Sequence, residues 1–153
     1  MGIIIDGQNG TGKSFLCTEL QKRLPNYDLH HITGKHANTY TFYRHLLGYK
    51  VILDRGPLGE LVYSELYGRK PRISVKEVNE ILRYTNCYVI CQSVDTIYNN
   101  LCNKGEQENS ECNKEWITTE RNLFFKYIRM MKNITLVPND FRRTNMVLEV
   151  LKE

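Results

Sequence analysis

One eight-residue segment near the start of the chain constrains the fold more than any other feature. Residues 7–14 read GQNGTGKS and match the pattern G-x-x-x-x-G-K-[ST] at every fixed position. An apolar run at residues 3–5 precedes the segment, and a helical pattern follows it. Glycines at this spacing let the backbone curl so that successive amides point inward, and the next helix directs its positive end to the same point. The segment therefore predicts a strand, an anion-binding loop and a helix, in that order.

The rest of the chain alternates short apolar runs with amphipathic segments. We expect strands at residues 1–6, 27–32, 49–54, 87–92 and 133–137. We expect helices at residues 13–24, 37–47, 58–67, 74–84, 94–103, 115–131 and 141–152, with a polar loop at 104–114. Apolar strands that alternate with helices are typical of a parallel sheet covered on both faces. The pattern predicts an α/β, three-layer fold of the P-loop NTPase type, with a five-stranded parallel sheet and helices on both faces.

Length and composition indicate a single domain over residues 1–153. The chain is 41% hydrophobic and 25% charged, which is ordinary for a globular protein and rules out a low-complexity chain. It contains no apolar run near the roughly 20 residues of a membrane helix and no secretion signal, so we expect a cytoplasmic protein with no membrane partner. The five cysteines show no CxxC spacing, and we expect reduced thiols. A net charge of +4 is too small to indicate nucleic acid as a partner.

The anion-binding loop supplies most of the candidate site residues. In this motif the lysine, here Lys13, reaches the outer phosphates of a nucleoside triphosphate, and the hydroxyl of Ser14 ligates Mg²⁺. The sequence therefore predicts ATP as the phosphate donor and Mg²⁺ as the cofactor. The predicted ATP-binding residues are Gly7, Asn9, Gly10, Thr11, Gly12, Lys13, Ser14 and Phe15.

A carboxylate and an arginine end the third predicted strand. Asp54 closes an apolar run, and Arg55 follows it. Because the carboxyl ends of parallel strands meet at one edge of a sheet, both side chains should lie beside the loop. We expect Asp54 to hold Mg²⁺ with Ser14, and Arg55 to bind a transferring or acceptor phosphate, so Lys13, Asp54 and Arg55 are the predicted catalytic residues. The alternative is that Asp54 and Arg55 only pair with each other or cap the next helix.

These motifs, in this order, resemble the thymidylate kinase and deoxynucleoside kinase family of P-loop kinases, in a shortened form. The resemblance rests on the loop at 7–14, GYKVILDRGPLGELVY at 48–63, CQSVDTIYNNLCNKGE at 91–106 and TTERNLFFKYI at 118–128. It implies a phosphotransferase with Mg²⁺·ATP as donor, a short lid at about 104–115, and an adenine site near 138–141. It also implies a small-molecule nucleotide acceptor and allows for a homodimer.

The acceptor is the part of the site that the sequence leaves most open. By resemblance to nucleoside, polynucleotide and shikimate-type kinases, an acid that takes the proton of a hydroxyl acceptor would lie near the end of the second strand. Residues 30–36, in that region, contain no Asp or Glu. A phosphate acceptor needs no such base, because it is already largely ionised at pH 7. The sequence therefore predicts a (deoxy)nucleoside monophosphate acceptor, as in thymidylate kinases. Its predicted binding residues are Lys35, Arg44 and Tyr63.

Two alternatives stay open. A hydroxyl acceptor, such as a deoxynucleoside, a polynucleotide 5′-OH or a small alcohol, would require His31 or His36 as the base. An ATP-binding regulatory protein without catalysis is the other alternative, since the segment 104–120 has two lysines against five glutamates and is a poor phosphate clamp. The candidate closing cations there are Lys104 and Arg121. The basic residues at 69–72 are expected to form a solvated turn.

Overall fold

Five parallel strands form one sheet in the computed structural model, which describes residues 2–103, 112–137 and 143–151. The strands are β1 (Ile3–Gly7), β2 (Asp28–His31), β3 (Val51–Asp54), β4 (Asn86–Ile90) and β5 (Ile134–Val137). They lie in the order β2-β3-β1-β4-β5, so β1 is central. Ile5 on β1 lies opposite Asp54 on β3, which brings the carboxyl ends of these two strands together. All five predicted strands are confirmed, with ends shifted by at most two residues.

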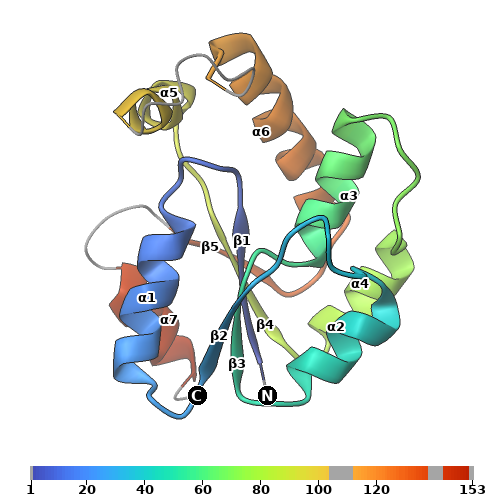
Figure 1. Ribbon diagram of the computed structural model, residues 1–153, viewed down its shortest axis with the longest axis vertical. Helices are drawn as coiled ribbons and strands as arrows, with labels where there is room; N and C mark the ends of the chain where they lie inside the picture. The colour runs from blue at the N-terminus through green and yellow to red at the C-terminus, as the bar shows by residue number, and fades with distance from the viewer. Residues whose placement is uncertain (1, 104–111, 138–142, 152–153) are drawn as a thin grey trace.

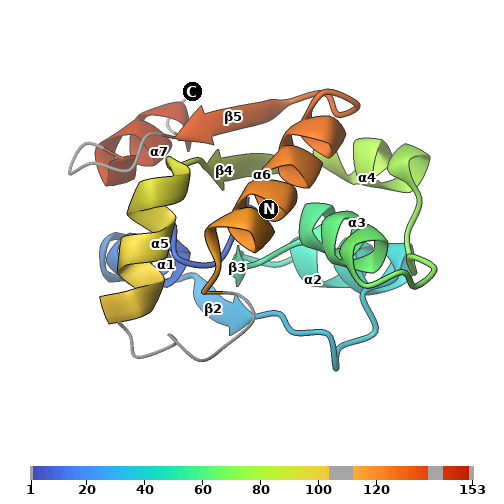
Figure 2. The same cartoon turned by 90° about the horizontal axis from the view of Figure 1, so that it is seen from above.

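Helices cover both faces of the sheet and its carboxyl edge (Figure 1). They are α1 (Lys13–Arg23), α2 (Tyr40–Leu47), α3 (Pro57–Leu66), α4 (Val75–Leu82), α5 (Val94–Asn103), α6 (Lys114–Ile128) and α7 (Arg143–Leu151). α1 and α7 lie on one face and α2, α3 and α4 on the other, while α5 and α6 lie toward the carboxyl edge, as Figure 2 shows from above. The predicted three-layer architecture is confirmed. Among the described residues, no helix is both long and apolar enough to cross a membrane.

The alternation of side chains along the central strands divides the core into two clusters. Ile5 packs with Leu16 of α1, and Ile4 packs with Leu58 of α3 on the opposite face. Side chains two residues apart on a strand share a face. The same alternation therefore directs Asp6 toward α3 and Asp54 toward α1, and this division organises the site.

Capping side chains set the starts of α2 and α4. α2 begins at Tyr40 instead of residue 37, because Asn38 has a φ of +53° and the Thr39 hydroxyl caps the helix by accepting from the amide of Phe42. α4 begins with a capping box formed by Ser74 and Glu77, which lies three residues later. α6 ends three residues earlier than expected. Most of the predicted loop at 104–114 lies outside the described residues.

Candidate active site

Two cavities lie side by side at the carboxyl edge of the sheet. The larger, which we call the loop cavity, has a volume of about 480 Å³ and forms around the loop at residues 7–14. The smaller, which we call the α3 cavity, has a volume of about 180 Å³. Residues that line the loop cavity are Asn9, Gly10, Gly12, Lys13, Ser14, Phe15, His31, Asp54, Arg55, Asn100, Leu101 and Asn103.

The curl of the loop requires glycine at residues 7 and 12, where the loop leaves β1 and where it enters α1. Gly7 has a φ of +133°, and a Cβ on it would lie 2.7 Å from the carbonyl oxygen of Ile90. Gly12 has a φ of +89° and is the N-cap of α1, so the helix begins at Lys13 with its first amides directed toward the loop cavity. The predicted strand, loop and helix are confirmed in this geometry.

Lys13 is buried at the base of the loop. Its Nζ donates to the carbonyl oxygen of Gln8 at 2.9 Å, and the hydroxyl of Thr11 donates to the same oxygen at 2.6 Å. Burial lowers the pKa of Lys13 to about 8; the charge of Arg55 acts in the same direction, and the carboxylates of Asp6 and Asp54 oppose it. A bound anion would restore the charge of this lysine, since it supplies the opposite charge that the buried ammonium lacks.

Ser14 and Asp54, the two residues predicted to hold Mg²⁺, lie within hydrogen-bond distance of each other. The Ser14 hydroxyl donates to Asp54 Oδ2 at 2.8 Å, and Nδ1 of His31 lies 3.0 Å from the same oxygen. The other oxygen, Asp54 Oδ1, is buried and has no hydrogen-bond partner within the described residues. A hydroxyl and a carboxylate with an unused oxygen are the hard ligands that Mg²⁺ takes beside substrate phosphates. The residues present therefore fit this cation.

Two amide side chains that the sequence analysis did not single out join the loop to α5 and α6. Nε2 of Gln8 donates to the carbonyl oxygen of Ile117 on α6 at 2.8 Å. Nδ2 of Asn100 on α5 donates to the carbonyl oxygen of Gly10 at 2.7 Å. Both contacts join segments about a hundred residues apart, and no spacing in the sequence indicates them.

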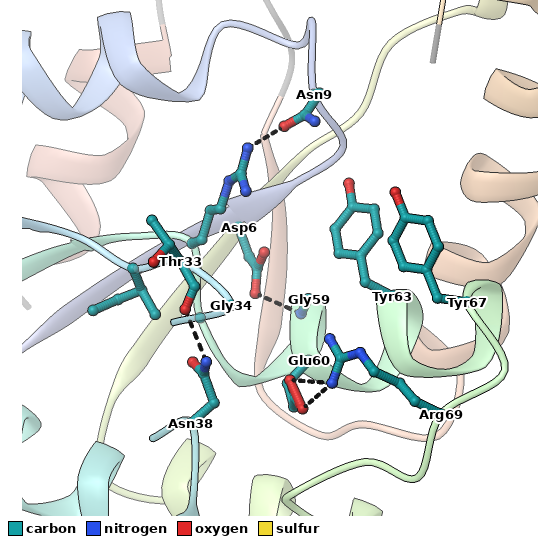
Figure 3. A pocket seen from close by; sticks show the side chains of 13 residues that line it. Asp6, Asn9, Thr33, Gly34, Asn38, Gly59, Glu60, Tyr63, Tyr67 and Arg69 are labelled. Atoms are coloured by element: carbon teal, nitrogen blue, oxygen red, sulfur yellow. Dashed lines mark hydrogen bonds and ion pairs between the residues drawn. The ribbon is translucent and has the colours of Figure 1, made fainter. Parts of the chain in front are cut away.

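The α3 cavity opens beside the first turns of α3 (Figure 3). Tyr63 and Tyr67 stand side by side along one wall, with ring centroids 6.3 Å apart and planes 24° from parallel. The hydroxyl of Tyr63 donates to Glu120 on α6 at 2.9 Å. Residues that line the cavity are Asp6, Asn9, Ile32, Thr33, Gly34, Asn38, Arg55, Gly56, Gly59, Glu60, Tyr63, Tyr67 and Arg69.

Arg55 and Asn9 line both cavities and form the wall between them. A nitrogen of the Arg55 guanidinium donates to Asn9 Oδ1 at 2.5 Å. The Arg55 amide donates to the carbonyl oxygen of Ile5 at 2.9 Å, so its backbone is tied to the end of β1. This arginine thus stands where a group leaving one cavity would enter the other.

A buried carboxylate organises the far wall of the α3 cavity. Glu60 is 6% exposed and accepts from Arg69 and Arg72, each at 2.8 Å. Burial alone would raise the pKa of Glu60, but the hydrogen bonds from Arg72 and Arg69 lower it below the ordinary value. The basic residues at 69–72 are therefore not simply a solvated turn, because two of them pair with Glu60.

Several predicted site residues lie elsewhere. Lys35 is exposed in a turn, and Arg44 lies between the rings of Tyr40 and Tyr84 at 5.7 Å from each, so neither lines the α3 cavity. Arg121 donates to the carbonyl oxygen of Gln92 at 2.8 Å and lines neither large cavity.

The two candidate histidine bases are also outside the α3 cavity. His31 lines the loop cavity, where it contacts Asp54, and His36 Nδ1 accepts from the amide of Thr33 at 3.0 Å. Lys104 and the expected adenine site at 138–141 lie outside the described residues, as does most of the lid at 104–115.

The fold matches solved structures, although the sequence matches no family model and no curated protein. YorR from Bacillus subtilis, in complex with phosphorylated GDP, superposes with a TM-score of 0.81 at 15% identity, over 99% of this chain and 96% of that one. Deoxyadenosine kinase from M. mycoides with bound dCTP has a TM-score of 0.67 at 15% identity, over 99% of both chains. Shikimate kinase from Acinetobacter baumannii in complex with shikimate has a TM-score of 0.56 at 12% identity, over 99% of this chain and 90% of that one. The chain has the fold of P-loop kinases, and these similarities do not single out the thymidylate kinases.

Proposed function

We propose that the protein is a kinase that transfers the γ-phosphate of Mg²⁺·ATP to a small acceptor bound in the α3 cavity. The observation that carries the proposal is the wall of Arg55 and Asn9 between two cavities. One cavity has the backbone, lysine and hydroxyl of an ATP phosphate site. The other is a separate space that opens at the same edge. Two adjoining cavities with an arginine between them suit transfer of a phosphoryl group.

In this proposal the loop cavity holds the donor. The amides of residues 10–14 and the Lys13 ammonium would bind the phosphates, and Ser14 and Asp54 would hold Mg²⁺. The cation, when bound, supplies charge that offsets the negative charge of the outer phosphates. His31 keeps Asp54 in place through its contact with Oδ2. Arg55 would stabilise the charge that develops on the transferring group.

The shape and lining of the α3 cavity suit an acceptor with a planar ring. The paired rings of Tyr63 and Tyr67 offer a stacking surface along one wall. One of the solved structures of similar fold is a deoxyadenosine kinase, which supports a nucleoside-type acceptor. We therefore propose a nucleoside as the acceptor class.

The charges of the cavity favour a hydroxyl as the group that receives the phosphate. Arg69 is paired with Glu60, and Asp6 adds a second carboxylate to the lining. Of the three residues predicted to bind an acceptor phosphate, only Tyr63 lines the cavity. A monophosphate would therefore meet Arg55 as its main cation and two carboxylates of its own sign.

A nucleoside monophosphate is the second candidate, and the position of Arg55 supports it. An arginine that reaches both cavities could bind a donor and an acceptor phosphate at once. The acceptor would then need no proton-accepting group. The two candidates differ in one measurable property, which is the substrate that stimulates release of ADP.

The proposal is tested by ADP release from Mg²⁺·ATP with purified protein. The acceptors are the common deoxynucleosides, their 5′-monophosphates and a 5′-hydroxyl oligonucleotide. We expect one nucleoside to stimulate release, and we expect Lys13→Met to lower that rate by about 10² to 10⁴. Lys22→Met, an exposed lysine on the same helix, is the matched control and should keep the rate. ATP binding without stimulation by any acceptor would contradict the proposal.

A further inference from the structure

Two carboxylates line the α3 cavity, and they are held in different ways. Glu60 is held by the guanidinium groups of Arg69 and Arg72. Asp6 is held by the backbone: Oδ1 accepts from the amide of Gly7 at 3.0 Å, and Oδ2 accepts from the amide of Gly59 at 3.2 Å. Figure 3 shows the Asp6 side chain between the Asn9 side chain and Gly59. Backbone amides therefore fix the orientation of Asp6, without an ion pair to Arg69 or Arg72.

The oxygens of Asp6 keep room for one more partner. A carboxylate oxygen can accept two hydrogen bonds, and each oxygen here receives one from the backbone. The neighbouring wall has no side chains at two positions: a Cβ on Gly56 would lie 3.2 Å from Oδ2, and a Cβ on Gly59 would lie 3.4 Å from Oδ1. Both glycines line the cavity. Asp6 is only 1% exposed, but it lines the cavity, and no side chain at Gly56 or Gly59 covers its carboxylate.

From this geometry we propose that Asp6 accepts the proton of the acceptor hydroxyl during phosphoryl transfer. The inference rests on the proposed kinase function and narrows the acceptor to an alcohol. The hydroxyl oxygen forms a bond to the γ-phosphorus as the bond from that phosphorus to the ADP oxygen breaks. ADP keeps the electron pair of the broken bond, and the hydroxyl proton passes to Asp6. Asp6 returns to its ionised form by releasing this proton to solvent after the product leaves.

The electrostatic surroundings of Asp6 suit a proton acceptor. Burial raises the pKa of Asp6 above its ordinary value of 3.8, while the amides of Gly7 and Gly59 and the charges of Lys13 and Arg55 act in the opposite direction. A carboxylate with a raised pKa is a stronger base than an ordinary aspartate. The titratable and charged groups that face it are Lys13, Tyr43, Arg55, Glu60, Tyr63 and Cys87.

Two variants and a pH profile test this role in the full-length protein. With the nucleoside identified in the ADP-release panel, Asp6→Asn should lower kcat by about 10² to 10⁴ and leave the Kd for ATP within about threefold. Gly59→Ala places a methyl group against Asp6 on the cavity floor. It should lower kcat/KM for the nucleoside at least tenfold, and the added alanine suits the helix. Asp28→Asn, at the opposite end of the sheet, is the matched control.

The outcomes separate this inference from the proposed function. Release of ADP with monophosphates alone would leave the kinase proposal standing and overturn the role of Asp6. Full kcat in Asp6→Asn would also overturn it. If Asp6→Asn does not fold, Gly59→Ala and the wild-type pH profile decide. The profile should show kcat falling as the pH is lowered, with a midpoint above pH 3.8. A kcat that does not fall as the pH is lowered to 3.8 would overturn the inference. No stimulation by any acceptor would instead contradict the kinase proposal.

Discussion

Arg55 has a backbone conformation that residues with a side chain rarely adopt. Its φ is +78°, in the left-handed region where glycine is at ease. Holding a long side chain there costs about 1 kcal/mol or more in folding free energy. Strain of this kind persists where the surroundings fix the residue, and here the Arg55 amide is bound to Ile5 and the guanidinium to Asn9. The strained backbone places the arginine between the two cavities.

Two substitutions of Arg55 separate its chemistry from its backbone. Arg55→Ala and Arg55→Gly both remove the guanidinium, so both should lower acceptor-dependent turnover by about 10² to 10³. Arg55→Gly also relieves the left-handed strain, and its free energy of unfolding should exceed that of Arg55→Ala by about 1 kcal/mol. Urea unfolding of the two variants measures the difference. Equal stabilities would show that the backbone is not strained, and full turnover would exclude Arg55 from the transfer.

At the level of elements, the segment between β2 and α2 forms one wall of the α3 cavity without regular structure. The buried side chain of Asn38 donates to the carbonyl oxygens of Thr33 and His36 at 2.9 and 3.0 Å, and it accepts from the Tyr43 hydroxyl at 2.6 Å. Arg72, which precedes the N-cap of α4 by two residues, donates to the carbonyl oxygen of His36 at 2.9 Å. The segment is therefore held from both sides in the shape that the cavity requires.

Arg72 should act on acceptor binding through this segment. Arg72→Ala removes its contacts to the segment and half of the charge that neutralises Glu60. We expect KM for the acceptor to rise about tenfold, while KM for ATP stays within about twofold. Lys70→Ala, an exposed cation two residues away, should leave both constants unchanged. Equal changes in the two KM values would contradict a role confined to the α3 cavity.

The Glu60 ion pairs also make a prediction for stability against pH. Because its arginine partners hold the pKa of Glu60 below the ordinary value of 4.5, its ionised form stabilises the fold above that pH. This contribution is lost as the pH falls through the lowered pKa. Arg72→Ala should therefore flatten the decline in unfolding free energy below pH 4.5, which acid titrations of urea unfolding would measure. An unchanged decline would show that the pair does not contribute.

At the scale of the whole molecule, the two faces of one sheet lead to the two cavities. Asp54 faces α1 and the loop cavity, whereas Asp6 on the neighbouring strand faces α3 and the α3 cavity. Arg55 follows directly from β3 and stands at the boundary. Parallel strands with helices on both faces place ligands at their carboxyl edge, and here the two cavities share that edge.

The sequence predicts the proposed donor cavity better than the proposed acceptor cavity. The loop at 7–14 and Asp54 are local signals whose spacing fixes their geometry, so the fold and the meeting of Ser14 with Asp54 follow from them. The acceptor side is built from long-range contacts, such as that of Arg72 with Glu60, which no local pattern encodes. One feature of the sequence did point to the α3 cavity: Asp6 lies two residues after Ile4, so strand alternation places it on the face away from α1.

Transfer of labelled phosphate tests the central claim most directly. ATP radiolabelled in its γ-phosphate is incubated with the protein, Mg²⁺ and the nucleoside, and the products are separated. We predict that the label appears in the nucleoside 5′-phosphate with the wild-type protein, and that Lys13→Met forms almost none. Label that appears only as inorganic phosphate, or that remains in ATP with every acceptor, would contradict phosphoryl transfer between the two cavities.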